Sequence, residues 1–209
     1  MEIISHRGYW LKASEKNTVE AFKRSFSLGF GTETDVRDLA GTLVISHDPP
    51  KGEELTLDEL LMLAGSAQPT LAINIKSDGL ADTLKETMRR HDYKNWFVFD
   101  MSVPDTRGQL AAGNPTYLRI SEFETESPMQ PHAAGVWLDA FKSDEWRIEE
   151  LRRLITANIK VCIVSPELHK RDHGDFWLLL KNSGLHNSDL VVLCTDIPEQ
   201  AVDFFKVKA

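Results

Sequence analysis

Three short clusters of charged and histidine side chains lie within the first fifty residues of the chain. They are His6-Arg7, Glu33 with Asp35, and His47-Asp48. Hydrolysis of a phosphodiester needs a positive charge on the phosphoryl oxygens, a base or nucleophile, and an acid for the leaving alkoxide. An arginine, carboxylates and two histidines meet those needs. The chemistry expected of this segment is therefore metal-assisted hydrolysis of a phosphodiester.

The two carboxylates of the middle cluster, Glu33 and Asp35, stand two residues apart in a predicted strand. Their side chains therefore point to the same side of that strand. Two carboxylates aimed into one site repel each other unless a cation joins them, and oxygen donors suit a hard divalent ion. From composition alone, a solvated strand end or a helix cap is the alternative interpretation.

His6 and His47 each follow an apolar run that is predicted to be a strand. The ordinary pKa of histidine lies near neutrality, so either side chain is suited to accept or to donate a proton. Taken singly, each is as readily interpreted as a packed or surface histidine. Together with Arg7 and the carboxylates, the two histidines favour an acid-base pair.

Short β-branched runs alternate with longer amphipathic stretches, a pattern typical of parallel strands joined by crossover helices. Eight such runs are predicted strands, with a further short strand over Thr42–Ser46. The eight are Ile3–Ser5, Gly31–Val36, Thr70–Lys76, Trp96–Asp100, Tyr117–Ser121, Gly135–Asp139, Lys160–Ser165 and Leu190–Thr195. The predicted helices are Thr18–Leu28, Thr56–Ala64, Leu80–Arg90, Thr106–Ala112, Asp144–Ala157, Asp175–Ser183 and Glu199–Lys206.

Two architectures fit this alternation, an open doubly wound sheet and a closed (β/α)8 TIM barrel, for which 209 residues is short. Eight repeats favour the barrel. The chain has no internal repeat or linker, so we expect a single α/β domain over residues 1–209. In either architecture the ligand site lies beyond the carboxyl ends of the strands, which is where the three clusters lie.

Composition narrows the class of partner. The chain is 42% apolar and has 32 acidic against 24 basic residues, a formal charge of -8. That charge opposes binding to nucleic acid and favours a small-molecule substrate. Cys162 and Cys194 lie in apolar runs and are expected to be buried hydrophobes. Without a leader-like start or a membrane-span pattern, the expected location is cytoplasmic, and the sequence says nothing of oligomeric state.

A longer motif connects the three clusters. The chain carries His6-Arg7-Gly8, then Glu15-Lys16-Asn17-Thr18 before Ala21-Phe22, then Glu33-Thr34-Asp35-Val36, then His47-Asp48, and Thr195-Asp196-Ile197-Pro198 near its end. In order and spacing these residues resemble the motif of the glycerophosphodiester phosphodiesterase family, with Lys16 inserted. The short run from Asp48 to Glu54 leaves no room for a lid domain, as in a short single-domain member.

This resemblance implies a (β/α)8 barrel that hydrolyses a glycerophosphodiester to an alcohol and glycerol 3-phosphate. It implies that His6 and His47 are the general acid and base, one of them a candidate for attack on phosphorus. Arg7 would clamp the phosphate. Glu33 and Asp35 would hold a divalent cation, Mg²⁺ or Ca²⁺.

The chain departs from the family at the next strand, where the family's Glu-x-Lys is replaced by Asn74-Ile75-Lys76. Asparagine offers a carbonyl oxygen but no charge, and the affinity of a hard ion falls with ligand charge. We therefore expect Asn74 to be the third ligand of a weakened metal site and Lys76 to contact a phosphate oxygen. Candidates to compensate for the lost charge are the strand-end carboxylates Asp100, Glu122 and Asp139.

Two other functions stay open from the sequence. The first is a barrel that binds a phosphoester without turnover, because its metal site has lost a carboxylate. The second is an isomerase or aldolase that uses Lys76 to form a Schiff base, as a lysine at a strand end can. The two histidines argue against the first.

Overall fold

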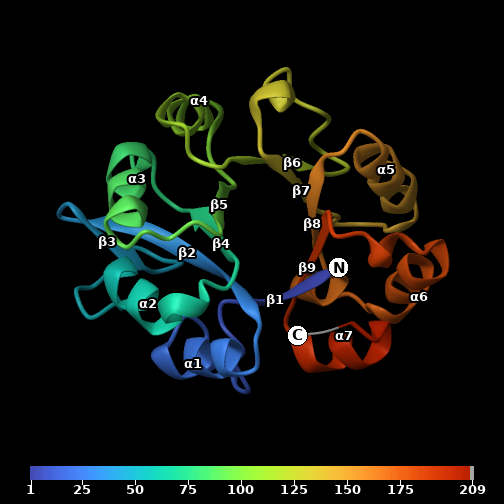
Figure 1. Ribbon diagram of the computed structural model, residues 1–209, viewed down its shortest axis with the longest axis horizontal. Coiled ribbons are helices and arrows are strands. Elements are labelled where there is room, and N and C mark those ends of the chain that lie inside the picture. Colours follow the sequence, from blue (N-terminus) through green and yellow to red (C-terminus); the bar gives the residue numbers. More distant parts are fainter. Residues whose placement is uncertain (208–209) are drawn as a thin grey trace. The chain divides into compact units, whose positions relative to one another are not determined.

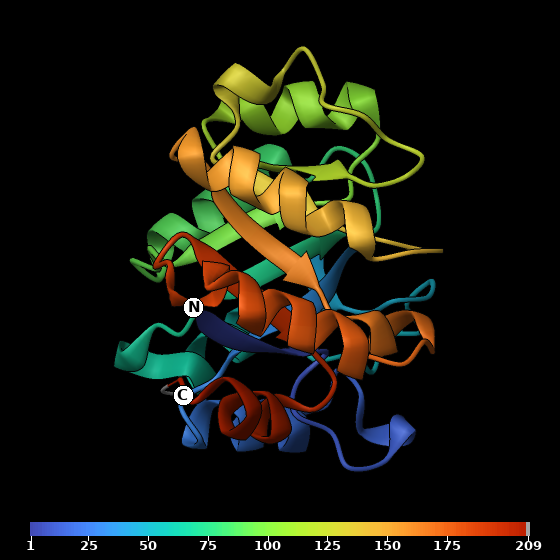
Figure 2. The same cartoon turned by 90° about the vertical axis from the view of Figure 1, so that its right-hand side faces the viewer.

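The computed structural model describes residues 1–207, in which parallel strands alternate with helices (Figures 1 and 2). The strands are β1 (Glu2–His6), β2 (Gly31–Leu39), β3 (Thr42–Ile45), β4 (Leu71–Ile75), β5 (Trp96–Phe99), β6 (Tyr117–Ile120), β7 (Gly135–Leu138), β8 (Lys160–Val164) and β9 (Val191–Thr195). The α-helices are α1 (Val19–Ser27), α2 (Leu57–Ala64), α3 (Ala81–Arg90), α4 (Val103–Ala112), α5 (Glu145–Thr156), α6 (Gly174–Ser183) and α7 (Pro198–Phe205). Every predicted strand and helix is present.

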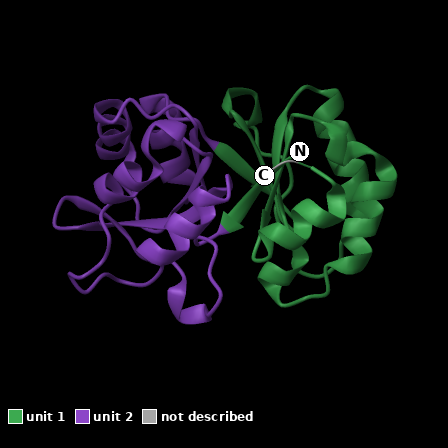
Figure 3. Cartoon of the chain, turned by 60° about the horizontal axis from the view of Figure 1, so that its bottom comes forward, with its two compact units in different colours: residues 1–5, 117–209 green, residues 6–116 purple. Residues whose placement is uncertain are grey.

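The contacts divide the chain into two compact units (Figure 3). Unit 1 comprises Met1–Ser5 and Tyr117–Ala209, and unit 2 comprises His6–Thr116. In unit 1 the strand order is β1-β9-β8-β7-β6, all parallel. In unit 2 the order is β5-β4-β2, also parallel, and β3 pairs with β2 as an antiparallel hairpin.

The hydrophobic core of unit 2 lies between its sheet and helices α1, α2 and α3. Phe22 of α1, Leu60 of α2 and Leu84 of α3 are fully buried against the strand residues Val36 and Ile73. Those strand side chains share the outer face of the sheet, because they alternate with residues such as Asp35 and Asn74 that point to the opposite face. Packing of the apolar face against the helices therefore fixes the strands that carry the polar side chains on the opposite face.

Local sequence signals mark the starts of three helices. Thr56 forms a capping box with Glu59, as the spacing predicts, and Pro198 occupies the first turn of α7. Helix α4 starts at Val103, three residues before the predicted start at Thr106, because the Ser102 side chain caps it.

In unit 1 the middle strands β8 and β9 are almost continuously buried, as expected when helices cover a parallel sheet. Cys162 and Cys194 lie on these paired strands and are buried, as predicted. Among the described residues, no helix is long and apolar enough to cross a membrane.

Candidate active site

The turn that follows β1 sets the position of Arg7. Arg7 and Gly8 both have positive φ, at 60° and 79°. Their amides donate to the Glu33 carbonyl and to the Thr32 hydroxyl of β2, each at 2.9 Å. A Cβ on Gly8 would lie 2.7 Å from the Ala21 Cβ, so only glycine fits this turn against α1.

The two carboxylates of β2 are deeply buried, at 1% exposure for Glu33 and 0% for Asp35. Each has a basic partner from the turn: His6 Nε2 lies 3.8 Å from Glu33 Oε2, and Arg7 Nε lies 2.9 Å from Asp35 Oδ2. Burial raises the pKa of Glu33 to about 7; the positive charge of a protonated His6 opposes the rise and the Asp35 carboxylate adds to it. The structure thus brings four predicted site residues together.

Strand β4 adds Asn74 to the same face, and Lys76 follows directly after the strand. Asn74 is the parallel-strand partner of Asp35, so the two side chains lie next to each other. The Lys76 ammonium lies 3.6 Å from Asp35 Oδ1 and 3.6 Å from Asp100 Oδ2. Lys76 therefore bridges two carboxylates beside the predicted phosphate site.

Three buried oxygens on this face have no hydrogen-bond partner: Glu33 Oε2, Asp35 Oδ1 and Asn74 Oδ1. A buried acceptor left without a donor is costly, and native structures rarely keep one without a reason. Here three such oxygens come from the three predicted metal ligands, and oxygen is the donor that Mg²⁺ and Ca²⁺ take. The residues present therefore fit a divalent cation. With asparagine in the third place, however, residues 1–207 hold no metal-binding group of three or more His, Cys, Asp or Glu side chains.

His47 lies at the edge of a cleft of about 680 Å³, on the loop that follows β3. Its Nδ1 lies 2.9 Å from the Asp48 carboxylate, and its side chain is 49% exposed. This hydrogen bond to His47 lowers the pKa of Asp48. Arg37 Nε donates to the His47 carbonyl at 3.0 Å and so fixes the loop.

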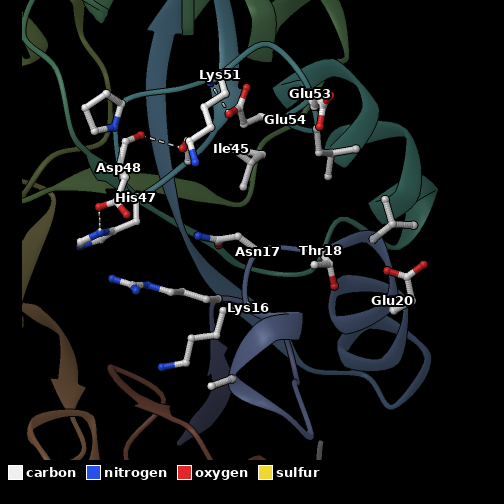
Figure 4. A pocket seen from close by; sticks show the side chains of 16 residues that line it. Lys16, Asn17, Thr18, Glu20, Ile45, His47, Asp48, Lys51, Glu53 and Glu54 are labelled. Carbon is white, nitrogen blue, oxygen red and sulfur yellow. Dashed lines mark hydrogen bonds and ion pairs between the residues drawn. The ribbon is translucent and has the colours of Figure 1, made fainter.

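The cleft connects the predicted phosphate-binding arginine with the second histidine. Arg7 and His47 both line it, and Lys16 and Asn17 come from the loop before α1 (Figure 4). In Figure 4, Lys16 and His47 come from two different loops that border the cleft. The wall beyond His47 is the short run Asp48, Pro49, Lys51, Glu53, Glu54 and Leu55, which continues directly into α2, so no lid domain is inserted here.

The three carboxylates considered as compensating ligands have other partners. The Glu122 carboxylate accepts hydrogen bonds from the backbone amides of residues 141–143 in unit 1. Burial alone would raise the pKa of Glu122, but these hydrogen bonds outweigh it and hold the pKa at about 2. Asp139 Oδ1 lies 2.7 Å from His169 Nε2, and Asp100 is paired with Lys76.

The sequence indicates no role for Asn17 and leaves that of Glu15 open. Glu15 accepts the Leu11 amide and pairs with Arg24 at 2.9 Å, so it stabilises the loop before α1. Asn17 donates to Asp35 Oδ2 at 3.0 Å and contacts the site directly. The only sequence signal for Asn17 was its place in the Glu-Asn-Thr motif, which the inserted Lys16 obscured.

No protein-family model and no curated protein matches this sequence, whereas solved structures do. A glycerophosphodiester phosphodiesterase from Parabacteroides distasonis ATCC 8503 superposes with a TM-score of 0.77 at 16% identity, over 98% of this chain and 96% of that one. The glycerophosphodiester phosphodiesterase from Agrobacterium tumefaciens str. C58 superposes with a TM-score of 0.72 at 18% identity, over 99% of this chain and 100% of that one. The Oleispira antarctica phosphodiesterase OLEI02445 was solved in complex with the product sn-glycerol-3-phosphate. It superposes with a TM-score of 0.71 at 15% identity, over 99% of this chain and 97% of that one.

Likeness at these identities shows the fold. The fold predicted from the alternation of strands and helices, and implied by the resemblance of the motif, is therefore confirmed. This chain has a (β/α)8 TIM-barrel fold similar to that of solved glycerophosphodiester phosphodiesterases.

Proposed function

We propose that this chain hydrolyses a small glycerophosphodiester to an alcohol and glycerol 3-phosphate, with a divalent cation bound by Glu33, Asp35 and Asn74. The observation that carries the proposal is that each of these residues has one buried oxygen without a hydrogen-bond partner, next to Arg7 and His6. The fold supports it, since phosphodiesterases share it and one of them holds sn-glycerol-3-phosphate.

Arg7 and Lys76 are assigned to the phosphoryl group. Both side chains are partly exposed, at 21% and 19%, while the Asp35 carboxylate that they contact is buried. Each basic group thus has one side against Asp35 and another side accessible to a ligand. A guanidinium offers parallel donors to two phosphoryl oxygens, and the lysine adds a point charge.

His6 and His47 are assigned to proton transfer. One imidazole takes the proton of the attacking water and the other delivers a proton to the leaving alkoxide, so the net proton count is unchanged. Asp48 orients the His47 ring through Nδ1, so that Nε2 is the nitrogen for proton transfer. His6 Nε2 faces Glu33.

A cation held by Glu33, Asp35 and Asn74 would neutralise charge on a phosphoryl oxygen when bound. The donor set has two carboxylates and one amide, a low ligand charge for Mg²⁺ or Ca²⁺. We therefore propose a weaker metal site than one built from three carboxylates.

The test is hydrolysis of a panel of glycerophosphodiesters that differ in the alcohol, followed by ³¹P NMR with Mg²⁺, with Ca²⁺ and with EDTA. The expected product is glycerol 3-phosphate, formed with added cation and lost with EDTA. Absence of hydrolysis on every substrate, or release of the other phosphomonoester, would contradict the proposal.

The specific observation behind the second candidate, a phosphoester-binding barrel without turnover, is the missing third carboxylate at Asn74. Calorimetric titration with the same phosphodiesters distinguishes the two. Binding without any cation-stimulated hydrolysis would favour the binding protein.

A further inference from the structure

We infer that Asn17 is a positioning residue for the cation site, acting through the carboxylate of Asp35. The inference rests on the proposed function, because it assigns Asn17 to the metal site proposed there. Asn17 lies on the loop before α1, outside the strands that carry the ligands, and it lines the cleft (Figure 4).

The Asn17 side chain has a hydrogen-bond partner on each side of its amide. Its Nδ2 donates to Asp35 Oδ2 at 3.0 Å, and its Oδ1 accepts the Thr34 hydroxyl at 2.9 Å. Thr34 and Asp35 are adjacent on β2, and both are fully buried. The Thr34 hydroxyl thus sets which end of the amide faces the carboxylate, because a flipped amide would place oxygen against oxygen.

Because of this contact, the two carboxylate oxygens of Asp35 have different surroundings. Oδ2 accepts a hydrogen bond from Asn17 Nδ2 and forms an ion pair with the Arg7 guanidinium, whereas Oδ1 has no hydrogen bond and lies 3.6 Å from the Lys76 ammonium. A purely structural clamp would gain from satisfying both oxygens, since an unpaired buried acceptor costs free energy. The arrangement instead locks the carboxylate and leaves Oδ1 as a ligand atom.

The Asn17 backbone joins the same network. Its amide donates to the Arg7 carbonyl at 2.9 Å, and its φ is 59°. Asparagine tolerates this left-handed conformation better than most residues, and its side chain still reaches Asp35 from there. One residue therefore connects the Arg7 turn with the ligand on β2.

The experiment measures the dissociation constant for Ca²⁺ and for Mg²⁺ by calorimetry on the whole chain, without substrate. Asn17→Gly removes the amide but suits positive φ, so the variant is expected to fold. We expect its dissociation constants to rise roughly 10- to 100-fold, the usual cost of losing a residue that orients a metal ligand. Asn158→Gly is the matched control: Asn158 also has a positive φ, at 60°, but lies two residues after the end of α5, and we expect no change.

Two further variants test whether the effect runs through Asp35. Thr34→Val frees the amide to rotate, so it should weaken binding and should add little in the Asn17→Gly background. In an Asp35→Asn background, Asn17→Gly should lose its effect. Cation affinity in Asn17→Gly within about twofold of wild type, or an equal loss in the Asp35→Asn background, would overturn the inference.

Turnover is measured separately on the same preparations. A failure of the inference about Asn17 can then be distinguished from a failure of the proposed hydrolysis. Wild-type chain that binds no cation at all overturns this inference and the metal site, even if hydrolysis persists. Wild-type chain that binds cation through Asn17 but hydrolyses nothing overturns the proposed hydrolysis and leaves the positioning role standing.

Discussion

Arg7 Nε lies 2.9 Å from Oδ2 of Asp35, so the proposed phosphate-binding residue and a proposed metal ligand form one ion pair. Asp35 is fully buried, while part of the Arg7 side chain is accessible. A carboxylate held in this way fixes the direction of the guanidinium before substrate arrives. Substrate binding and cation binding are therefore expected to depend on each other at this pair.

The first prediction concerns the guanidinium itself. Lysine keeps the charge of Arg7 but cannot offer two parallel donors to a phosphoryl group. We expect Arg7→Lys to lower kcat/KM by about 10²-fold, the usual cost of losing a donor to developing charge. Steady-state kinetics would show this, with Arg89→Lys on the exposed face of α3 as a control that keeps full activity. Equal kinetics for both variants would contradict the assignment.

The second prediction follows from the raised pKa of Glu33, about 7 in the folded chain against an ordinary 4.5. Between these values the folded chain keeps a proton that the unfolded chain releases. This contribution to stability is therefore complete below pH 4.5 and is lost as the pH rises through 7.

Glu33→Gln removes this titration. In EDTA we expect the Tm of the variant, relative to wild type, to rise between about pH 5 and about pH 8. Thermal unfolding followed by circular dichroism measures it. A Tm difference that stays constant over this window would show that Glu33 is not the titrating group.

The third prediction concerns the charge of the metal site. Asn74→Asp adds a carboxylate at almost constant size, and hard-ion affinity rises with ligand charge. We expect Ca²⁺ to bind at least about tenfold more tightly to Asn74→Asp than to wild type, and more weakly to Asn74→Ala. Calorimetric titration gives the order of the three proteins. If the three affinities are equal, Asn74 is not a ligand.

The fourth prediction concerns the turn that holds Arg7. Gly8→Ala combines positive φ with a Cβ 2.7 Å from the Ala21 Cβ. We expect it to lower the free energy of unfolding by roughly 2–3 kcal/mol. Gly41→Ala is the matched control: its φ is also positive, at 87°, but the added Cβ meets nothing, so about 1 kcal/mol is expected. Urea unfolding that gives the two variants the same stability would contradict the close-packing argument.

Much of the fold could be predicted because it depends on local patterns. Apolar runs located the strands, and the Thr56-Glu59 box and Pro198 located helix starts. Strand β2 was predicted to end at Val36, yet it continues to Leu39 in a hairpin with β3. The hairpin turn, Ala40-Gly41, has positive φ at both residues, but alanine is a weak signal for such a turn.

The site was predictable only in part, because some of its contacts depend on long-range structure and not on local patterns. The two-residue spacing of Glu33 and Asp35 showed that they share a face, and strand ends indicated where Asn74 and Lys76 lie. The Asn17 contact with Asp35 depends on the path of a loop, which local patterns do not encode. The pairing of Asp100 with Lys76 depends in the same way on the order of β4 and β5 in the sheet.

The most direct test of the central claim is the hydrolysis rate of a glycerophosphodiester, with divalent cation present, by wild type, His6→Ala and His47→Ala. An acid-base pair predicts that each variant loses roughly 10²- to 10⁴-fold in kcat while it still folds and binds cation. Full activity in either variant would contradict the claim that these two histidines carry the proton transfers.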